Sequence, residues 1–202
     1  MGGLLAVSRA IDSFNYKFGV IANYLVLIAA LLSAANAGFR YGINALIQLS
    51  REFHFLSGIQ VLVRWYSDHS NSFLEAQWYM FTAMVLFGAA WTLKVNEHVR
   101  VDLFYGWVSD RARIWIDLLG GILFLMPMCV ILIYFTWPWF LDAWLTGERS
   151  ANAGGLVRWP VKLVLPLGFA LVALQGVSEI IKCLAALTVG YRREHAYEKP
   201  LQ

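Results

Sequence analysis

Few side chains in this chain combine a type and a spacing that could support chemistry, and most of those lie in long apolar stretches. On the last stretch Gln175, Glu179 and Lys182 follow one another at intervals of four and three residues, which places them on one helical face. Asp117 lies near the start of the preceding stretch. Charged groups inside a bilayer are costly, so they indicate function or ion pairing. We interpret Asp117, Glu179 and Lys182 as a structural cluster between two helices; a proton or sodium relay is the alternative.

A second group of polar residues is the run Asn96-Glu97-His98-Val99-Arg100-Val101-Asp102, which lies between the second and third apolar stretches. It mixes acidic, basic and apolar residues at tight spacing. Its side chains could therefore pair within a turn or with a partner protein. The simpler interpretation is an ordinary polar connection between two helices.

The sequence contains no pattern typical of a catalytic or metal site. Cys129 and Cys183 both fall in apolar sequence, and no CxxC pair is present. A b-type haem needs axial histidines inside the helices, whereas all four histidines lie outside the apolar stretches: His54, His69, His98 and His195. Nucleophile-elbow, phosphate-loop and zinc-protease motifs are missing. We predict a protein that is not an enzyme and that has no cofactor and no metal ligands.

The elements that carry these residues are four long apolar stretches. Hydrophobic residues make up 59% of the 202 residues and charged residues only 14%, against about 25% charged in soluble domains. A hydrocarbon core about 30 Å thick needs about 20 helical residues. We predict an all-α integral membrane protein, one membrane domain over 1–202, with four transmembrane helices at about 18–36, 77–95, 115–137 and 162–187. The nine tryptophans gather near the ends of these spans, as expected at membrane interfaces.

The first connection, residues 37–76, is long and patterned. Its apolar residues recur at spacings near three and four, at Ile43, Leu46, Ile47, Phe53 and Leu56. This pattern predicts an interfacial amphipathic helix over about 40–65; an extended end of the first span fits the same spacing. Residues 1–17 form a short amphipathic lead, which we expect to lie on the inner surface of the membrane.

The distribution of positive charge predicts the orientation of the spans. The larger share of the 16 Lys and Arg residues lies before the first span, between the second and third, and in or after the fourth. The positive-inside tendency therefore places both termini in the cytoplasm. Ala35-Asn36-Ala37 resembles a signal-peptide cleavage site, but the apolar core before it is longer than the roughly 7–15 residues of a signal peptide. We expect this first stretch to be retained.

Some of these features resemble a known family. Gly88-Ala89-Ala90 late in the second span, the run Glu97 to Asp102, and Arg111 with Arg113 are similar to the DctQ-type small membrane subunit of tripartite ATP-independent periplasmic (TRAP) transporters. The number and spacing of the spans extend the resemblance from about residue 18 to 187. The long first connection departs from the family pattern and suggests a larger variant of the small subunit.

The resemblance implies a scaffold that works beside other proteins. Its partners would be a large (M type) membrane subunit with the substrate and sodium sites and a periplasmic substrate-binding protein, in a bacterial inner membrane. Substrates of such systems are organic acids, and no substrate-binding residue is expected in this chain. Glu97, His98, Arg100 and Asp102 would form the family's structural turn. The lack of an internal repeat agrees with a partner subunit, and the spread of the net charge of +3 gives no indication of nucleic-acid binding. A membrane anchor for a redox enzyme and a small self-assembling channel are the alternatives.

Overall fold

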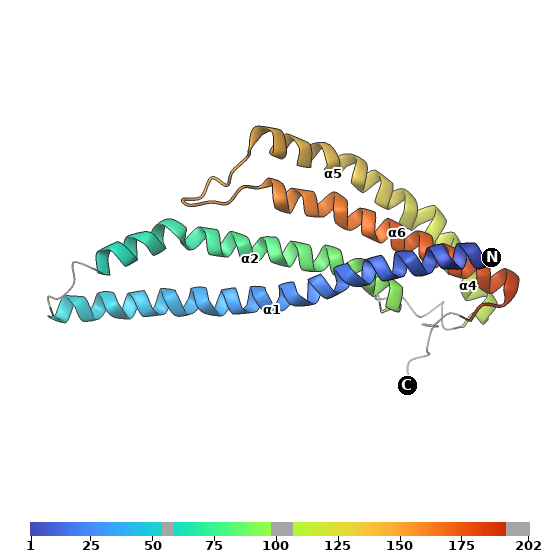
Figure 1. Ribbon diagram of the computed structural model, residues 1–202, viewed down its shortest axis with the longest axis horizontal. Coiled ribbons are helices and arrows are strands. Elements are labelled where there is room, and N and C mark those ends of the chain that lie inside the picture. Colours follow the sequence, from blue (N-terminus) through green and yellow to red (C-terminus); the bar gives the residue numbers. More distant parts are fainter. Residues whose placement is uncertain (54–58, 98–106, 193–202) are drawn as a thin grey trace.

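The fold is built from long helices. The computed structural model describes residues 1–53, 59–97 and 107–192, and in this part of the chain the only β-type pairing is an isolated bridge between Arg149 and Val157. The helices are α1 (Gly2–Phe53), α2 (Ile59–Val95), α4 (Asp110–Gly120), the π-helix η1 (Gly121–Leu125), α5 (Met126–Thr146) and α6 (Trp159–Val189) (Figure 1). Four helical segments are long and apolar enough to cross a membrane, and each contains one predicted span. The predicted all-α fold with four spans is confirmed.

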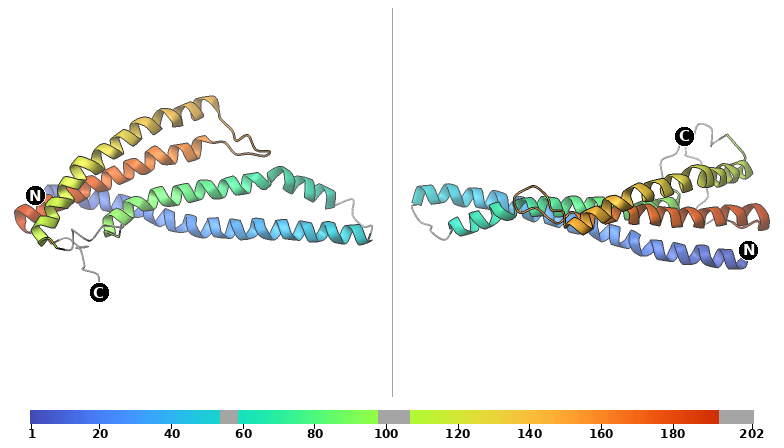
Figure 2. Two further views of the ribbon diagram at one scale, coloured as in Figure 1. Left: turned by 180° about the vertical axis from the view of Figure 1, so that it is seen from behind. Right: turned by 90° about the horizontal axis from the view of Figure 1, so that it is seen from above.

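The helices form two antiparallel pairs that pack together along α6. One pair is α1 with α2, and the other is α5 with α6 (Figures 1 and 2). Helix α6 also contacts α1, α2 and α4, so it lies at the centre of the bundle. The N-terminus lies at the same end of the bundle as the C-terminal ends of α2 and α6 (Figure 1). We call this end the terminal end. The opposite end, with the loop 147–158 between α5 and α6, is the loop end.

Most of the buried positions of α1 follow one another at intervals of seven residues. This inner stripe consists of Ser8, Asn15, Ala22, Ala29, Asn36 and Ile43, all of which are buried except for the partly buried Asn36. A repeat of seven residues keeps one face of a helix against partners that wrap around it with a left-handed supercoil. Small side chains in the stripe allow the helix backbones to approach closely.

The apolar core lies where α1, α2 and α6 meet. Its buried members are Ala22, Ala83, Phe87, Ala90 and Leu171. Phe18 and Phe87 meet edge to face with their ring centroids 5.2 Å apart. A Cβ atom added at Gly168 would lie 2.6 Å from Cβ of Leu86, so the close contact between α6 and α2 depends on that glycine.

The third span contains a local irregularity before Pro127. The backbone N–H of Met126 bonds to the carbonyl of Gly121, five residues earlier, and this defines the π-helix between α4 and α5. Pro127 has no N–H to donate. The bulge therefore lies next to the position where the regular ladder loses a bond, and the span continues through it.

The structure differs from the predictions for the first connection and for the N-terminal lead. Residues 2–17 belong to α1, and residues 40–53 also continue α1, while 59–65 begin α2. The alternative of an extended first span is the one the structure adopts, and residues 54–58 lie outside the described part. The reason is the inner stripe, whose spacing of seven continues from Ser8 to Ile43 without a break.

Because of this continuity, α1 and α2 are longer than a bilayer requires. The 52 residues of α1 measure about 78 Å, against about 30 Å of hydrocarbon.

The polar loop 147–158 must lie outside the hydrocarbon, and it contacts α2 at Glu75. From Glu75 to the end of α2 is about 30 Å. Residues 36–53 of α1 and 59–70 of α2 lie beyond the level of Glu75, and we call them the arm. The arm extends past the loop end of α5 and α6 (Figure 1).

Candidate functional site

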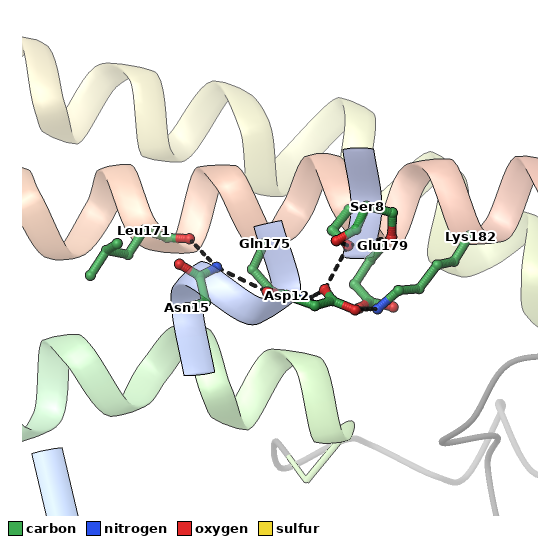
Figure 3. Close-up of polar contacts among 8 residues, drawn as sticks. Ser8, Asp12, Asn15, Leu171, Gln175, Glu179 and Lys182 are labelled. Carbon is green, nitrogen blue, oxygen red and sulfur yellow. Dashed lines mark hydrogen bonds and ion pairs between the residues drawn. The ribbon is translucent and has the colours of Figure 1, made fainter. Parts of the chain in front are cut away.

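A network of polar side chains joins α1 to α6 at the terminal end (Figure 3). We call it the terminal network. Helix α1 contributes Ser8, Asp12 and Asn15, and α6 contributes Gln175, Ser178, Glu179 and Lys182. The α1 residues follow one another at intervals of four and three and thus share one helical face, which lies against the matching face of α6.

The charged half of the terminal network has one cation between two carboxylates. The Lys182 ammonium lies 2.8 Å from Oδ2 of Asp12 and 2.8 Å from Oε1 of Glu179. The Gln175 amide donates to the same two groups, at 2.9 Å to Asp12 and 3.0 Å to Glu179. The side chains of Asp12 and Lys182 are 13% and 14% exposed. Each carboxylate is therefore held by an ion pair and by a neutral donor.

The neutral half of the network is buried completely. Asn15 donates from Nδ2 to the Gln175 side-chain oxygen at 2.9 Å and to the Leu171 carbonyl at 3.2 Å. The Ser178 hydroxyl lies 2.7 Å from Oδ1 of Asp12 and 2.7 Å from the Ser8 hydroxyl. Such side-chain bonds between membrane helices fix their relative register. Among the described residues, Oδ1 of Asn15 is the buried side-chain atom left without a hydrogen-bond partner.

The structure brings Glu179 and Lys182 of the predicted cluster together, and it supplies Asp12 as a further carboxylate. Asp117 lies on α4, which also packs against α6, and its side chain is partly buried. In the described part of the chain, no group of three His, Cys, Asp or Glu residues could hold a metal ion. Lys182 forms ion pairs with both Asp12 and Glu179, so these three charged groups are satisfied within the protein.

A second group of contacts, the loop network, attaches the loop 147–158 to α2. Its centre is the Glu75 carboxylate, which is 5% exposed. It accepts hydrogen bonds from the Ser150 hydroxyl, from the Asn152 amide at 2.9 Å and from the Leu156 backbone N–H at 2.7 Å. The Tyr79 hydroxyl adds a bond to the Val157 carbonyl at 3.2 Å. Several side chains of α2 thus attach the loop, and Glu75 makes the largest number of these bonds.

The base of the same loop is closed by an ion pair. Lys162 contacts the Glu148 carboxylate, and Arg158 lies 3.3 Å from it. The Lys162 ammonium also lies 4.4 Å from the centre of the Trp139 ring, a cation–π contact. The hydrogen bond from Lys162 is the largest influence on Glu148, and with Arg158 it holds the pKa of that carboxyl below its ordinary value despite some desolvation.

The predicted structural turn begins where α2 ends. Asn96 adopts a left-handed conformation with φ of 62°, and the Glu97 N–H donates to the Thr92 carbonyl at 3.2 Å. This is a common way of ending a helix. The Glu97 side chain is exposed. His98, Arg100 and Asp102 lie outside the described residues.

Several residues of both networks escaped the sequence analysis. Asp12 and Asn15 fall within residues 1–17, which the sequence predicts to be a surface helix, and no sequence pattern marks Glu75 as buried. The available signal was the spacing of Ser8, Asp12 and Asn15, which matches the polar spacing on α6. Because residues 1–17 are predicted as an element separate from the first span, this spacing does not indicate a contact with α6.

Comparison with known proteins identifies the family. The model of the tripartite ATP-independent periplasmic transporters, DctQ component, matches residues 54–186. The chain belongs to this family. It is thus a component of a transporter and not an enzyme, as predicted. No curated protein and no solved structure matches the chain. The family match begins after α1, so the α1 half of the terminal network lies outside it.

Proposed function

We propose that this DctQ-family chain is the small permease subunit of a TRAP transporter and that it scaffolds the large membrane subunit. The complex would import an organic acid, coupled to sodium, after delivery by a periplasmic binding protein. The family match is the observation that carries this proposal. The ion pairs of Lys182 with Asp12 and with Glu179 support a structural role for these charges.

The two networks suit a scaffold. A scaffold must keep its shape while its partner moves, and side-chain bonds between helices restrict sliding and tilting. The terminal network fastens α1 to α6, and the loop network fastens the α5–α6 loop to α2. The helices are therefore linked by polar contacts at both ends.

We place the chain in a bacterial inner membrane with both termini in the cytoplasm. The distribution of Lys and Arg supports this orientation. The loop 147–158 and the arm would then lie in the periplasm, where they could contact the binding protein. A reporter inserted near Ala151 tests the orientation, and a cytoplasmic signal there would reverse it.

The turn after α2 is proposed to contribute to assembly. Glu97, His98, Arg100 and Asp102 combine both signs of charge in the sequence that follows α2, within the family match. We expect His98→Ala or Asp102→Ala to reduce assembly or transport while membrane insertion stays normal. Uptake at the wild-type rate in both variants would leave the turn an ordinary connection.

The function itself is tested by reconstitution. The chain is co-expressed with a candidate large membrane subunit from the same genome, purified by a tag on the small subunit, and placed in liposomes. We expect the large subunit to co-purify in a fixed ratio. Uptake of an organic acid should then require both membrane subunits, the binding protein and an inward sodium gradient. Transport by the isolated small subunit, or uptake independent of it, would overturn the proposal.

A further inference from the structure

Helix α1 carries a second apolar stripe that no other part of the described chain covers. This outer stripe also repeats every seven residues, at Phe14, Ile21, Ile28, Ala35, Gly42 and Leu49. The four larger side chains are between 44% and 55% exposed, and a Cβ atom added at Gly42 would meet nothing within 4 Å. The inner stripe on the same helix has the same period and is covered by α2 and α6.

The outer stripe passes through two different surroundings. Its first half, to Ile28, lies at the level where lipid can cover apolar side chains. In its second half, Ala35 directly precedes the arm, and Gly42 and Leu49 lie in it. Because the polar loop that contacts Glu75 must lie outside the hydrocarbon, we infer that the arm does so too. A soluble protein could not reach the first half, and lipid tails could not cover the second. One occupant of the whole stripe must therefore cross the membrane and extend beyond it.

Within the arm, the exposed surface of α1 has two distinct faces. Arg40, Asn44 and Gln48, spaced by four, form a polar exposed face, as expected for contact with water. Phe39 and Leu46, beside Gly42 of the outer stripe, are 53% and 40% exposed. A helix that only met water here would not need the apolar face. Contiguous exposed apolar surface of this kind marks a protein contact.

The sizes of the side chains favour a different protein over a second copy of this chain. In a parallel pair of identical helices, each stripe residue would meet its own counterpart. Phe14, Ile21 and Ile28 would then hold the helices apart, while Ala35 and Gly42 would require a closer approach. A different helix that places large side chains opposite Ala35 and Gly42 would keep a constant distance between the two helix axes.

We propose that the outer stripe of α1 is the docking surface for one long transmembrane helix of the large membrane subunit, packed along α1 from the bilayer into the arm. This inference rests on the proposed function. It assigns a specific face to the contact, on a helix that lies outside the matched residues 54–186.

The first test places a photo-crosslinking amino acid at Gly42 or Leu49 on the stripe, and at Asn44 on the polar face as the control, in the full complex. We expect adducts with the large subunit from the two stripe positions and none from Asn44. Adducts with a second copy of this chain, with the binding protein, or with lipid alone would overturn the proposal.

The second test uses a matched pair of substitutions that add the same bulk two residues apart. Ala35→Trp places an indole on the stripe, whereas Ala37→Trp places it on the polar exposed side. We expect Ala35→Trp to lower the amount of large subunit retained by about tenfold, because overpacking a tight helix contact is costly. Ala37→Trp should retain the wild-type amount. Equal melting temperatures of the two isolated variants confirm that each one folds.

The two proposals can fail separately. If the wild-type pair assembles and transports, but the stripe yields no adduct and Ala35→Trp retains its partner, the docking surface is wrong and the proposed function stands. If the wild-type chain does not bind a large membrane subunit at all, the proposed function fails and this inference fails with it.

Discussion

The two ends of the bundle hold their carboxylates in opposite ways. At the terminal end, Asp12 and Glu179 share the Lys182 ammonium, and the contacts join side chains of two long helices. At the loop end, Glu75 is held by a hydroxyl, an amide and a backbone N–H of a single loop. The terminal network therefore determines how α1 lies on α6, while the loop network determines the shape of one connection.

This difference predicts a difference in cost. Breaking a buried ion pair leaves a charge that its surroundings cannot solvate, which costs about 3–5 kcal/mol. Removing Glu75 breaks contacts with one loop only, so the loop can open and bind water while the contacts between the helices remain. We thus expect global destabilisation from changes at the terminal end and local loosening from changes at the loop end.

The largest effect is expected from Lys182→Met. The change leaves two carboxylates close together without their cation, so the free energy of unfolding should fall by about 3–5 kcal/mol. Thermal or denaturant unfolding of the purified protein in detergent measures this. Adding Asp12→Asn and Glu179→Gln to the same variant should restore much of the loss, since no buried charge then remains.

Lys17→Met is the matched control for that change. Lys17 lies on α1 close to the network but is exposed, and surface substitutions usually change stability by less than about 0.5 kcal/mol. If Lys182→Met were no less stable than Lys17→Met, the terminal network would contribute nothing to the fold, and the contrast between the two ends would disappear.

The second effect in size is expected from Glu75→Ala. Three donors of the loop lose a charged acceptor, and hydrogen bonds to charged groups contribute about 1.5–3 kcal/mol. Amide hydrogen exchange in residues 148–158 should become faster, while exchange in α1 and the first half of α6 stays at the wild-type rate. Uniform acceleration throughout the chain would mean that Glu75 supports the whole bundle.

How much of this organisation could be predicted from the sequence depends on the distance between partners. The four spans follow from apolar stretches that are long enough to cross a bilayer, a local property. The partners of Asp12 and Glu75 lie more than 70 positions away, at Lys182 and Leu156. Spacing within one helix shows that polar residues share a face, but it does not reveal which other helix meets that face.

The arm shows a second limit of sequence patterns. The predicted first span ends at residue 36, and polar residues such as Arg40, Asn44 and Gln48 interrupt the apolar sequence beyond it. The inner stripe continues nevertheless, because Ile43 follows Asn36 at the same spacing of seven. Helix continuity here depends on packing against α2, which a hydropathy average does not record.

A third, smaller effect concerns the arm, which has neither network. The Tyr66 hydroxyl donates to the Asn36 side-chain oxygen at 2.9 Å and so links its two helices. Tyr66→Phe should cost about 1 kcal/mol and should accelerate exchange in residues 36–49 and 60–70 only. Tyr24→Phe is the control, because Tyr24 is 63% exposed on the same α1 helix. Equal exchange in the two variants would show that packing alone holds the arm together.

The smallest expected effect concerns Glu148, whose ion pair lies at the edge of the loop network. Its side chain is 29% exposed, so solvent screens much of the interaction. Because the pKa of Glu148 in the folded protein lies below its ordinary value of about 4.5, the carboxylate stabilises the loop above that value. The contribution is lost as the pH falls through the lowered pKa. Amide exchange in residues 148–158 should therefore show a step below pH 4.5 that Glu148→Gln abolishes. If the step persisted in Glu148→Gln, protonation of Glu75 would be its source, and the acid response of the loop would belong to the buried carboxylate instead.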